Sequence, residues 1–592
     1  MANKMNVMDA VVKVMEDEGV EYVFGVPGAA ILPLYKALST SRTITHLSVR
    51  HEEGGTHAAD GYARATGKVG ICIGTSGPAG TNMITGLYTA AADSIPIICI
   101  TGQAPTPVLH KEAFQAVDIV EIAKPVTKWA VQAKETAQLP WIFREAFRIA
   151  RAGRPGPVLI DLPLNIQKGP AIAYDPALDN RLAITKPEPN VNAIRRAIEL
   201  LMDAERPLLM PGGGVILGDA SEQLVALAAY LQVPVTPTYM GKGAIPEDHP
   251  LYAGTVGIQT SQRYANQIFL ESDFILSIGN RFADRHTGDL AVYRGNRTFV
   301  HIDIDPYQIG RVFPPDLGIV SDAGLALEAL LRVARDMTAA RQPTAWVARV
   351  GELRGTLKRK TDFEDVPIKP QRVYRELNAF FDRDTIFVTA IGLYQIWSGQ
   401  FQHTYKPRHY LCCGQAGPLG WEVPACIGVK LGRPDNLVVA VVGDYSFQFL
   451  MEEIAVAVQY KVPYVLVMVN NLYMGLIRQS EKYGYDDMNF AVDLSYDGAN
   501  GTSGIDHVAV MEAMGAAGRR VTRPDEIQDA LRWAVATSEE RRVPVLVEVM
   551  VEPTTDASMG TSIDKINEYE QIETGATEHA GAVINNLLPV TD

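Results

Sequence analysis

Cysteine is scarce in this sequence and shows no paired spacing. Five cysteines occur in 592 residues, an odd number, and none belongs to a CxxC pair. Disulfide frameworks and zinc ribbons need paired cysteines, so this pattern argues against both. A reducing compartment fits the pattern, and we expect a cytoplasmic protein. The five are Cys72, Cys99, Cys412, Cys413 and Cys426.

The sequence also lacks long basic runs and long apolar runs. Its formal net charge is −14, which argues against nucleic acid or an anionic membrane as the main partner. No apolar run reaches the roughly 18 residues of a membrane span, and the first residues lack the apolar core of a signal peptide. An anionic small-molecule substrate remains allowed, because a local arginine can override the overall field.

Apolar segments of strand length alternate with helical patterns along most of the chain, which predicts an α/β fold with parallel sheets. A length of 592 residues suggests three or four domains. Loops rich in proline and charge separate three such sets. We expect domains at residues 1–180, 190–345 and 370–553. The polar composition of residues 554–592 suggests a tail that forms a lid or is partly disordered. The expected strands of the middle set include residues 233–238.

Two apolar segments of the third set end in polar residues. Residues 437–442 and 465–469 read as buried parallel strands with a helix between them, so Asp444 and Asn471 emerge at neighbouring carboxyl ends. One carboxylate, one amide oxygen and the nearby carbonyl of Tyr473 form an oxygen site suited to Mg²⁺, which phosphate oxygens usually complete. The alternative is a turn aspartate and a polar loop that coincide by chance.

A second polar motif, Arg50-His51-Glu52-Glu53, stands between a strand and a helix. Acidic residues are common in the first turn of a helix, where they interact favourably with its dipole. Taken alone, the motif therefore favours a helix-terminus acid at Glu52 over a functional one.

Together these stretches resemble the thiamine-diphosphate (ThDP) enzymes. Gly443-Asp444-Tyr445 with Asn470-Asn471 resembles their diphosphate motif, and Arg50-His51-Glu52 with residues 60–67 resembles their pyrimidine-domain signature. The resemblance implies three doubly wound domains that bind the ThDP pyrimidine, FAD and the ThDP diphosphate. It also implies that Glu52 activates ThDP through the aminopyrimidine ring and that Leu419 holds its bent shape. Further implied site residues are Gln103, Gly392, Gln395, Gly417, Asp444, Tyr445, Ser446, Asn471, Tyr473, Gly475 and Leu476.

The middle set carries segments that resemble the FAD site of the acetohydroxyacid synthase group, where the flavin is structural and not redox-active. The glycines at 212–214 alone are a weak dinucleotide signal. The alternative is a domain that has lost its flavin. The implied FAD residues are Arg154, Gly212, Gly213, Gly214, Gly279, Arg281, Arg285, Asp303 and Asp322; Arg285 is also a candidate for binding a substrate carboxylate.

Within this family the sequence most resembles the glyoxylate carboligases, through segments such as residues 25–30, 285–288 and 413–421. The resemblance implies that a carboxy-lyase joins two glyoxylates into tartronate semialdehyde with release of CO₂. It also implies that two subunits share each ThDP, so that a dimer is the minimum active unit, and that the protein forms a tetramer. Glu52 departs from the pattern, because these carboligases carry valine there. Acetohydroxyacid synthesis from pyruvate and a catalytically silent ThDP/FAD-binding regulatory subunit are the alternatives.

Overall fold

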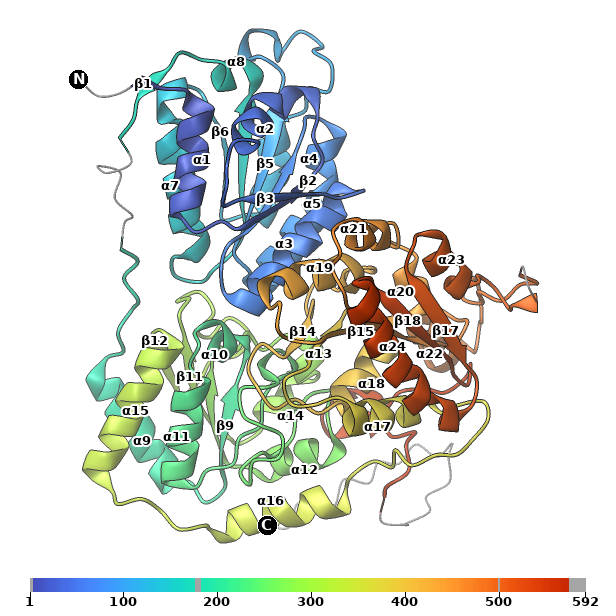
Figure 1. Ribbon diagram of the computed structural model, residues 1–592. Helices are drawn as coiled ribbons and strands as arrows, with labels where there is room; N and C mark the ends of the chain where they lie inside the picture. The colour runs from blue at the N-terminus through green and yellow to red at the C-terminus, as the bar shows by residue number, and fades with distance from the viewer. Residues whose placement is uncertain (1–3, 176–182, 499–500, 574–592) are drawn as a thin grey trace.

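The computed structural model describes residues 4–175, 183–498 and 501–573, and it contains three parallel sheets, each covered by helices on both faces (Figure 1). The prediction of three α/β domains with parallel sheets is confirmed. Within the described residues, no helix is long and apolar enough to cross a membrane.

The N-terminal sheet has six strands in the order β3-β2-β4-β5-β7-β6. Its strands are β2 (Tyr22–Gly25), β3 (Thr45–Ser48), β4 (Gly70–Gly74), β5 (Ile97–Gln103), β6 (Trp129–Gln132) and β7 (Val158–Pro163). Alternate side chains of the strands pack against different helices, as period-2 geometry requires. One face is covered by α1 (Val7–Asp17), α2 (Leu32–Leu38) and α7 (Leu139–Arg151). The other is covered by α3 (Glu52–Thr66), α5 (Ile84–Asp93) and α6 (Ile119–Ala123).

The C-terminal sheet repeats this topology, in the order β14-β13-β15-β16-β18-β17. Its strands are β13 (Ile386–Thr389), β14 (Tyr410–Cys412), β15 (Val438–Gly443), β16 (Val465–Asn470), β17 (Ala517–Val521) and β18 (Val545–Met550). One face packs on α17 (Pro370–Phe380), α18 (Leu393–Phe401) and α24 (Ile527–Arg541). The other packs on α19 (Glu422–Gly432), α21 (Glu453–Gln459) and α23 (His507–Ala513). If the six strands of each sheet are numbered in chain order, both sheets have the strand order 2-1-3-4-6-5. The first and third domains therefore share one architecture.

The central sheet has four parallel strands in the order β12-β11-β10-β9. They are β9 (Pro207–Pro211), β10 (Phe274–Ile278), β11 (Thr298–Asp303) and β12 (Leu317–Val320). Helices α9 (Val191–Asp203), α11 (Ser221–Leu231) and α15 (Ala323–Met337) cover one face. Helices α12 (Arg263–Glu271) and α16 (Ala345–Thr356) cover the other.

The strand expected at residues 233–238 is wrong. Only isolated bridges form there, from Val235 to Leu209 and to Tyr252. Pro234 and Pro237 carry no backbone N–H, so the segment cannot complete a ladder of hydrogen bonds.

Helices α3 and α19 bring the first and third domains together (Figure 1). A Cβ on Gly61 would lie 2.4 Å from the Ala425 carbonyl oxygen, and one on Gly428 would lie 1.8 Å from that of Ala58. Only glycine permits so close an approach of two backbones. This contact fixes α3, whose first residue is Glu52, against the C-terminal domain.

Residues 554–573 lie against the body of the protein. They contain a two-stranded sheet of β19 (Met559–Ser562) and β20 (Lys565–Asn567). The Asp289 amide donates to the Thr561 carbonyl, and buried Arg359 forms a two-point ion pair with Glu568. The polar composition of this segment had suggested a lid or a partly disordered tail. The remaining tail residues, 574–592, lie outside the described part of the chain.

Candidate active site

Asp444 and Asn471 lie at the carboxyl ends of neighbouring parallel strands. Gly443 of β15 pairs with Val469 of β16, so Asp444 and Asn471 follow the two strands at nearly the same level. Both side chains are buried. The Asn471 Oδ1 accepts from the Tyr473 amide at 3.3 Å, and the Tyr473 carbonyl accepts from the Gly475 amide at 2.7 Å. The three predicted metal ligands therefore belong to one edge of the sheet.

The electrostatics of this edge suit a cation. Burial raises the pKa of Asp444 from 3.8 to about 7, while a favourable interaction with His507 acts in the opposite direction. A bound divalent ion would favour the charged carboxylate. The described residues contain no group of three His, Cys, Asp or Glu side chains that could hold a metal. The predicted site would not form such a group, because two of its ligands are amide and carbonyl oxygens.

Glu52 begins α3 and is 8 % exposed. Its carboxylate accepts from the Asn82 side chain at 2.9 Å, within the N-terminal domain. Glu53, next to it, interacts instead with His57 at 3.4 Å. The amides of Arg50 and His51 both donate to the buried Glu453 of α21 at 2.9 Å. The C-terminal domain therefore holds the segment that carries Glu52.

The other predicted ThDP residues occupy two settings. Gln103 is buried, and its amide group donates to the Val117 carbonyl at 2.8 Å and to Asp161 at 3.3 Å. Leu419 and Leu476 are half-buried apolar side chains of the C-terminal domain. The remaining predicted contacts, Gly392, Gln395, Gly417, Tyr445, Ser446 and Gly475, lie on loops or helix starts of the same domain. Their roles toward the cofactor stay predictions.

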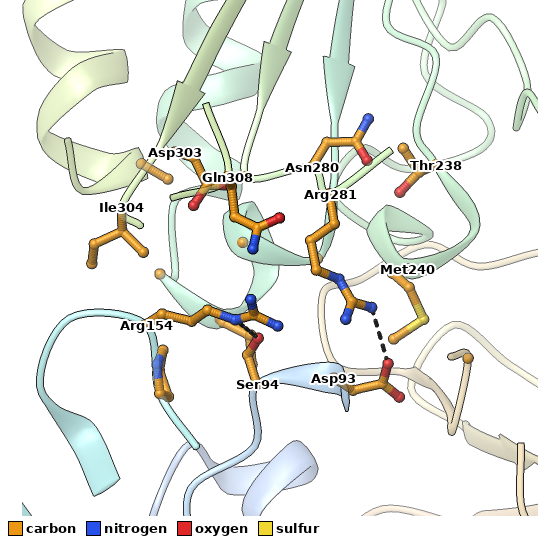
Figure 2. A pocket seen from close by; sticks show the side chains of 18 of the residues that line it. Asp93, Ser94, Arg154, Thr238, Met240, Asn280, Arg281, Asp303, Ile304 and Gln308 are labelled. Carbon is orange, nitrogen blue, oxygen red and sulfur yellow. Dashed lines mark hydrogen bonds and ion pairs between the residues drawn. The ribbon is translucent and has the colours of Figure 1, made fainter. Parts of the chain in front are cut away.

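A cavity of about 410 Å³ opens where the three domains meet. Figure 2 shows Arg281 directed at Asp93 and Arg154 at Ser94, with interatomic distances of 3.2 and 2.8 Å. Eight predicted FAD residues line the cavity: Arg154, Gly213, Gly214, Gly279, Arg281, Arg285, Asp303 and Asp322. The whole lining contains five arginines and three aspartates, a set that suits a ligand with both phosphate groups and hydroxyl donors.

The glycines beside the cavity have a packing role. A Cβ on Gly212 would lie 2.3 Å from the Gly279 carbonyl oxygen, and one on Gly279 would lie 2.6 Å from the Gly214 Cα. The loops after β9 and β10 therefore touch through their backbones.

The two predicted aspartates have different settings. Asp322 caps α15 by accepting from the Gly324 and Leu325 amides. Burial raises the pKa of Asp303 to about 6.

Arg285 lies between the cavity and the C-terminal domain. Its Nε donates to the Gln259 side chain at 2.7 Å, and its two terminal nitrogens donate to the Gly414 carbonyl and the Gln395 side chain, both at 3.4 Å. A guanidinium has five N–H groups, so two remain for a ligand. Sequence reasoning missed Gln259, because no local pattern relates it to Arg285.

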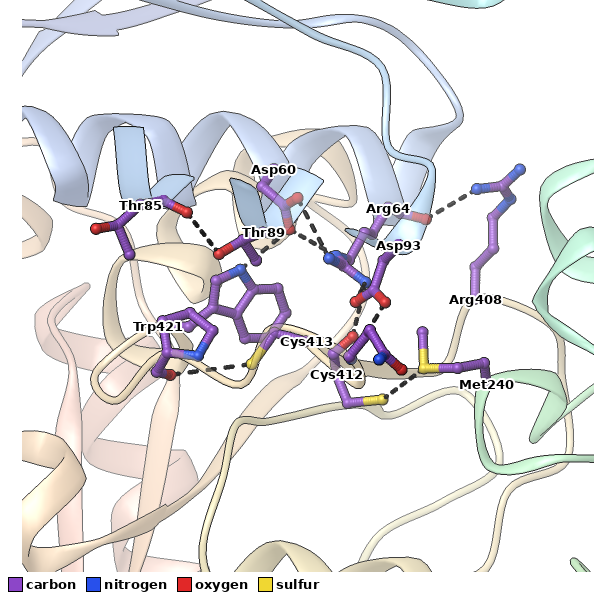
Figure 3. A network of polar contacts seen from close by, with 12 residues as sticks. Asp60, Arg64, Thr85, Thr89, Asp93, Met240, Arg408, Cys412, Cys413 and Trp421 are labelled. Atoms are coloured by element: carbon purple, nitrogen blue, oxygen red, sulfur yellow. Dashed lines mark hydrogen bonds and ion pairs between the residues drawn. The ribbon is translucent and has the colours of Figure 1, made fainter. Parts of the chain in front are cut away.

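Sequence reasoning also missed Asp93, whose carboxylate joins the three domains. Figure 3 shows Asp93 beside Arg64. It pairs with Arg64 of α3 at 3.1 Å and Arg281 of the central domain at 3.2 Å. It also accepts from the Gln415 amide of the C-terminal domain at 3.3 Å. The same network links Asp60 to Arg64 and to the Trp421 indole.

Comparisons with known proteins agree with this architecture. Three family models match: the N-terminal TPP binding domain of thiamine pyrophosphate enzymes over residues 5–122, their central domain over 194–330, and their C-terminal TPP binding domain over 390–549. The two TPP-binding matches fall on the domains that carry Glu52 and Asp444. Thiamine diphosphate is therefore supported as the cofactor.

Full-length relatives give a finer placement. Glyoxylate carboligase of Escherichia coli O157:H7 is 51% identical over 583 residues, 97% of this chain and 98% of the relative. A probable acetolactate synthase large subunit of Methanococcus aeolicus is 38% identical over 94% and 93% of the two chains. Acetolactate synthase isozyme 3 large subunit of E. coli K12 is 35% identical over 92% and 94%. The chain belongs to the thiamine pyrophosphate enzymes, in the group that holds these carboligase and acetolactate synthase subunits.

Proposed function

We propose that this enzyme joins two glyoxylate molecules into tartronate semialdehyde. Two glyoxylate anions and one proton give one tartronate semialdehyde anion and one CO₂, with no net redox change. The observation that carries the proposal is the 51% identity to glyoxylate carboligase over 97% of the chain, compared with 38% for the probable acetolactate synthase. Bound ThDP would supply the electron sink for the decarboxylation.

The residues described above have matching roles in this proposal. Asp444, Asn471 and the Tyr473 carbonyl would hold Mg²⁺ at the ThDP diphosphate. Glu52 would hydrogen-bond the aminopyrimidine ring, kept in place by Asn82 and by the bonds of Glu453 to the preceding amides. The two remaining N–H groups of Arg285 would bind a substrate carboxylate in two-point geometry. FAD would occupy the cavity between the domains in a structural role.

A second candidate function is acetolactate synthesis from pyruvate. Glu52 favours it, because the glyoxylate carboligases resembled by this sequence carry valine at that position. Product analysis with glyoxylate and pyruvate offered together tests both candidates. Tartronate semialdehyde as the main product supports the first proposal, and acetolactate supports the second. No release of CO₂ from either acid by the ThDP-, Mg²⁺- and FAD-loaded protein would favour a silent regulatory subunit.

We further propose that each site uses Glu52 of one chain and Asp444 of another, in a dimer or a tetramer. Within one chain, the segment before Glu52 contacts the side chains of Glu453, Gln459 and Tyr460 of the C-terminal domain. Mixing refolded or co-expressed Glu52→Gln and Asp444→Ala chains tests this arrangement. Mixed dimers contain one intact site, so activity should return to about one quarter of wild type. A site built within one chain would stay inactive in the mixture.

A further inference from the structure

Three loops of the C-terminal domain face the proposed ThDP diphosphate edge. They follow β13, β14 and β15 and contain Gly392, Gly417 and Asp444. A cofactor that contacts all three can bind only if their mutual spacing is correct. The side chains of Tyr394 and Glu422 contact these loops and connect them.

Tyr394 joins the first loop to the third. Its hydroxyl accepts from the Ile391 amide at 3.2 Å. Its ring lies against two glycines, so that a Cβ on Gly392 would be 2.8 Å from the ring and one on Gly443 would be 2.7 Å away. Gly443 directly precedes Asp444. The ring therefore sets the distance between the loop after β13 and the loop that carries the predicted metal ligand.

Glu422 joins the second loop to the other two. It begins α19, three positions after Leu419, and its side chain is fully buried. Its Oε1 accepts from the Tyr394 hydroxyl at 2.9 Å. The Ser446 hydroxyl accepts from the Gly420 amide at 2.9 Å, and it influences the pKa values of both Tyr394 and Glu422. Tyr394, Glu422 and Ser446 thus form one buried polar cluster behind all three loops.

We propose that Tyr394 and Glu422 are positioning residues that hold the three loops at the spacing that Mg²⁺-ThDP requires. This inference deepens the proposed function, because it rests on the same diphosphate edge. Preorganised loops lose little freedom on binding, whereas loops freed from the cluster must be ordered by the cofactor itself. Disrupting the cluster should therefore weaken ThDP binding while leaving the chemistry of the bound cofactor nearly intact.

Tyr394→Phe keeps the ring and removes the hydroxyl, which leaves Glu422 buried without its donor. We expect the ThDP Kd to rise up to about tenfold, the order for losing one buried hydrogen bond. Glu422→Leu should have a similar effect. Glu422→Gln keeps an acceptor for the Tyr394 hydroxyl and should retain affinity close to wild type. The double variant Tyr394→Phe/Glu422→Leu should be no weaker than either single variant, because both polar partners are gone.

Tyr464→Phe is the matched control. Tyr464 is fully buried in the same domain, and its hydroxyl donates at 3.3 Å to the carbonyl of Val423, the residue after Glu422. This variant removes a buried hydroxyl from the same helix contact and keeps the hydrogen bond between Tyr394 and Glu422. Calorimetric titration of ThDP and Mg²⁺ into FAD-loaded, ThDP-free protein gives the Kd values. The thermal midpoint without ThDP and the kcat at saturating ThDP complete the comparison.

The expected pattern is a raised ThDP Kd for Tyr394→Phe and Glu422→Leu, with wild-type values for Glu422→Gln and Tyr464→Phe. The kcat at saturating ThDP should recover in the two weakened variants. Wild-type affinity in those variants, or an equal loss in Tyr464→Phe, would overturn the inference. If the wild-type protein itself failed to bind ThDP, the assignment of this edge as a ThDP site would be wrong. ThDP binding is measured without substrate, so the result does not depend on whether the enzyme acts on glyoxylate or pyruvate.

Discussion

Replacing Glu422 by glutamine should change how the stability of the protein depends on pH. Burial raises the pKa of Glu422 from 4.5 to about 7, and hydrogen bonds from its own backbone, Ser446 and Tyr394 oppose this rise only in part. Below pH 4.5 the carboxyl is protonated in both the folded and the unfolded chain. As pH rises toward 7, the unfolded chain releases its proton while the folded chain retains it. The free energy of unfolding therefore falls through this window in the wild type.

The magnitude follows from the size of the pKa shift. The difference between 4.5 and about 7 is about 2.5 units, and each unit corresponds to about 1.4 kcal/mol, so the wild type loses about 3 kcal/mol. Glutamine carries no charge and loses nothing. In a domain of 150–250 residues, each kcal/mol shifts the thermal midpoint by about 2–4 °C. The thermal midpoint of Glu422→Gln minus that of the wild type should therefore increase by about 6–12 °C between pH 4.5 and pH 8.

The assay is thermal unfolding of FAD-loaded, ThDP-free protein at pH values from 4.5 to 8, for wild type and variant side by side. Glu540→Gln, at an exposed position of α24 in the same domain, controls for the loss of one negative charge from the surface. Its midpoint should follow that of the wild type. A difference between Glu422→Gln and wild type that stays constant with pH, or shrinks as pH rises, would refute a buried carboxyl with a raised pKa.

Three further predictions concern the cofactors. Asp444→Ala should abolish ThDP binding at ordinary Mg²⁺ concentrations, and unchanged affinity by calorimetry would contradict the metal assignment. Replacing FAD by a redox-inert analogue should preserve activity, because the proposed reaction has no net redox change; loss of activity at full occupancy in an intact oligomer would count against this. Glu52→Gln should slow exchange of the ThDP C2 proton by about 10²–10⁴, the usual contribution of a positioned acid–base group. Glu53→Gln, whose carboxylate faces His57, should leave that exchange nearly unchanged by NMR.

The sheet architecture could be predicted from the sequence, because buried parallel strands appear there as continuous apolar runs. Residues 437–442 and 465–469 are such runs, and their carboxyl ends place Asp444 beside Asn471. Residues 233–238 have a similar apolar pattern but fail to form a strand, because two prolines remove donors that a ladder needs. An apolar run indicates that a segment is buried, but a strand also needs backbone N–H groups that can donate to its neighbours.

The partners that hold the site together could not be predicted in the same way. Glu453 reaches the Arg50 amide across 403 positions of sequence, and Gln415 meets Asp93 across 322. Nothing in the composition near Glu453 or Asp93 distinguishes them from solvent-exposed acids. Their function depends on how the domains pack, and this packing depends on the glycine contacts between α3 and α19.

The position of Asp93 gives a physical basis for the proposal that FAD binds here without a redox role. Its buried carboxylate pairs with Arg64 and Arg281 and accepts from the Gln415 amide, so all three domains meet at one group on the wall of the cavity. A ligand in that cavity contacts each domain and binds only when the junction is formed. Such a ligand stabilises the assembled junction in proportion to its binding free energy. The same junction holds α3 against α19 and thereby places Glu52, so FAD would support the ThDP site through domain packing, without any transfer of electrons.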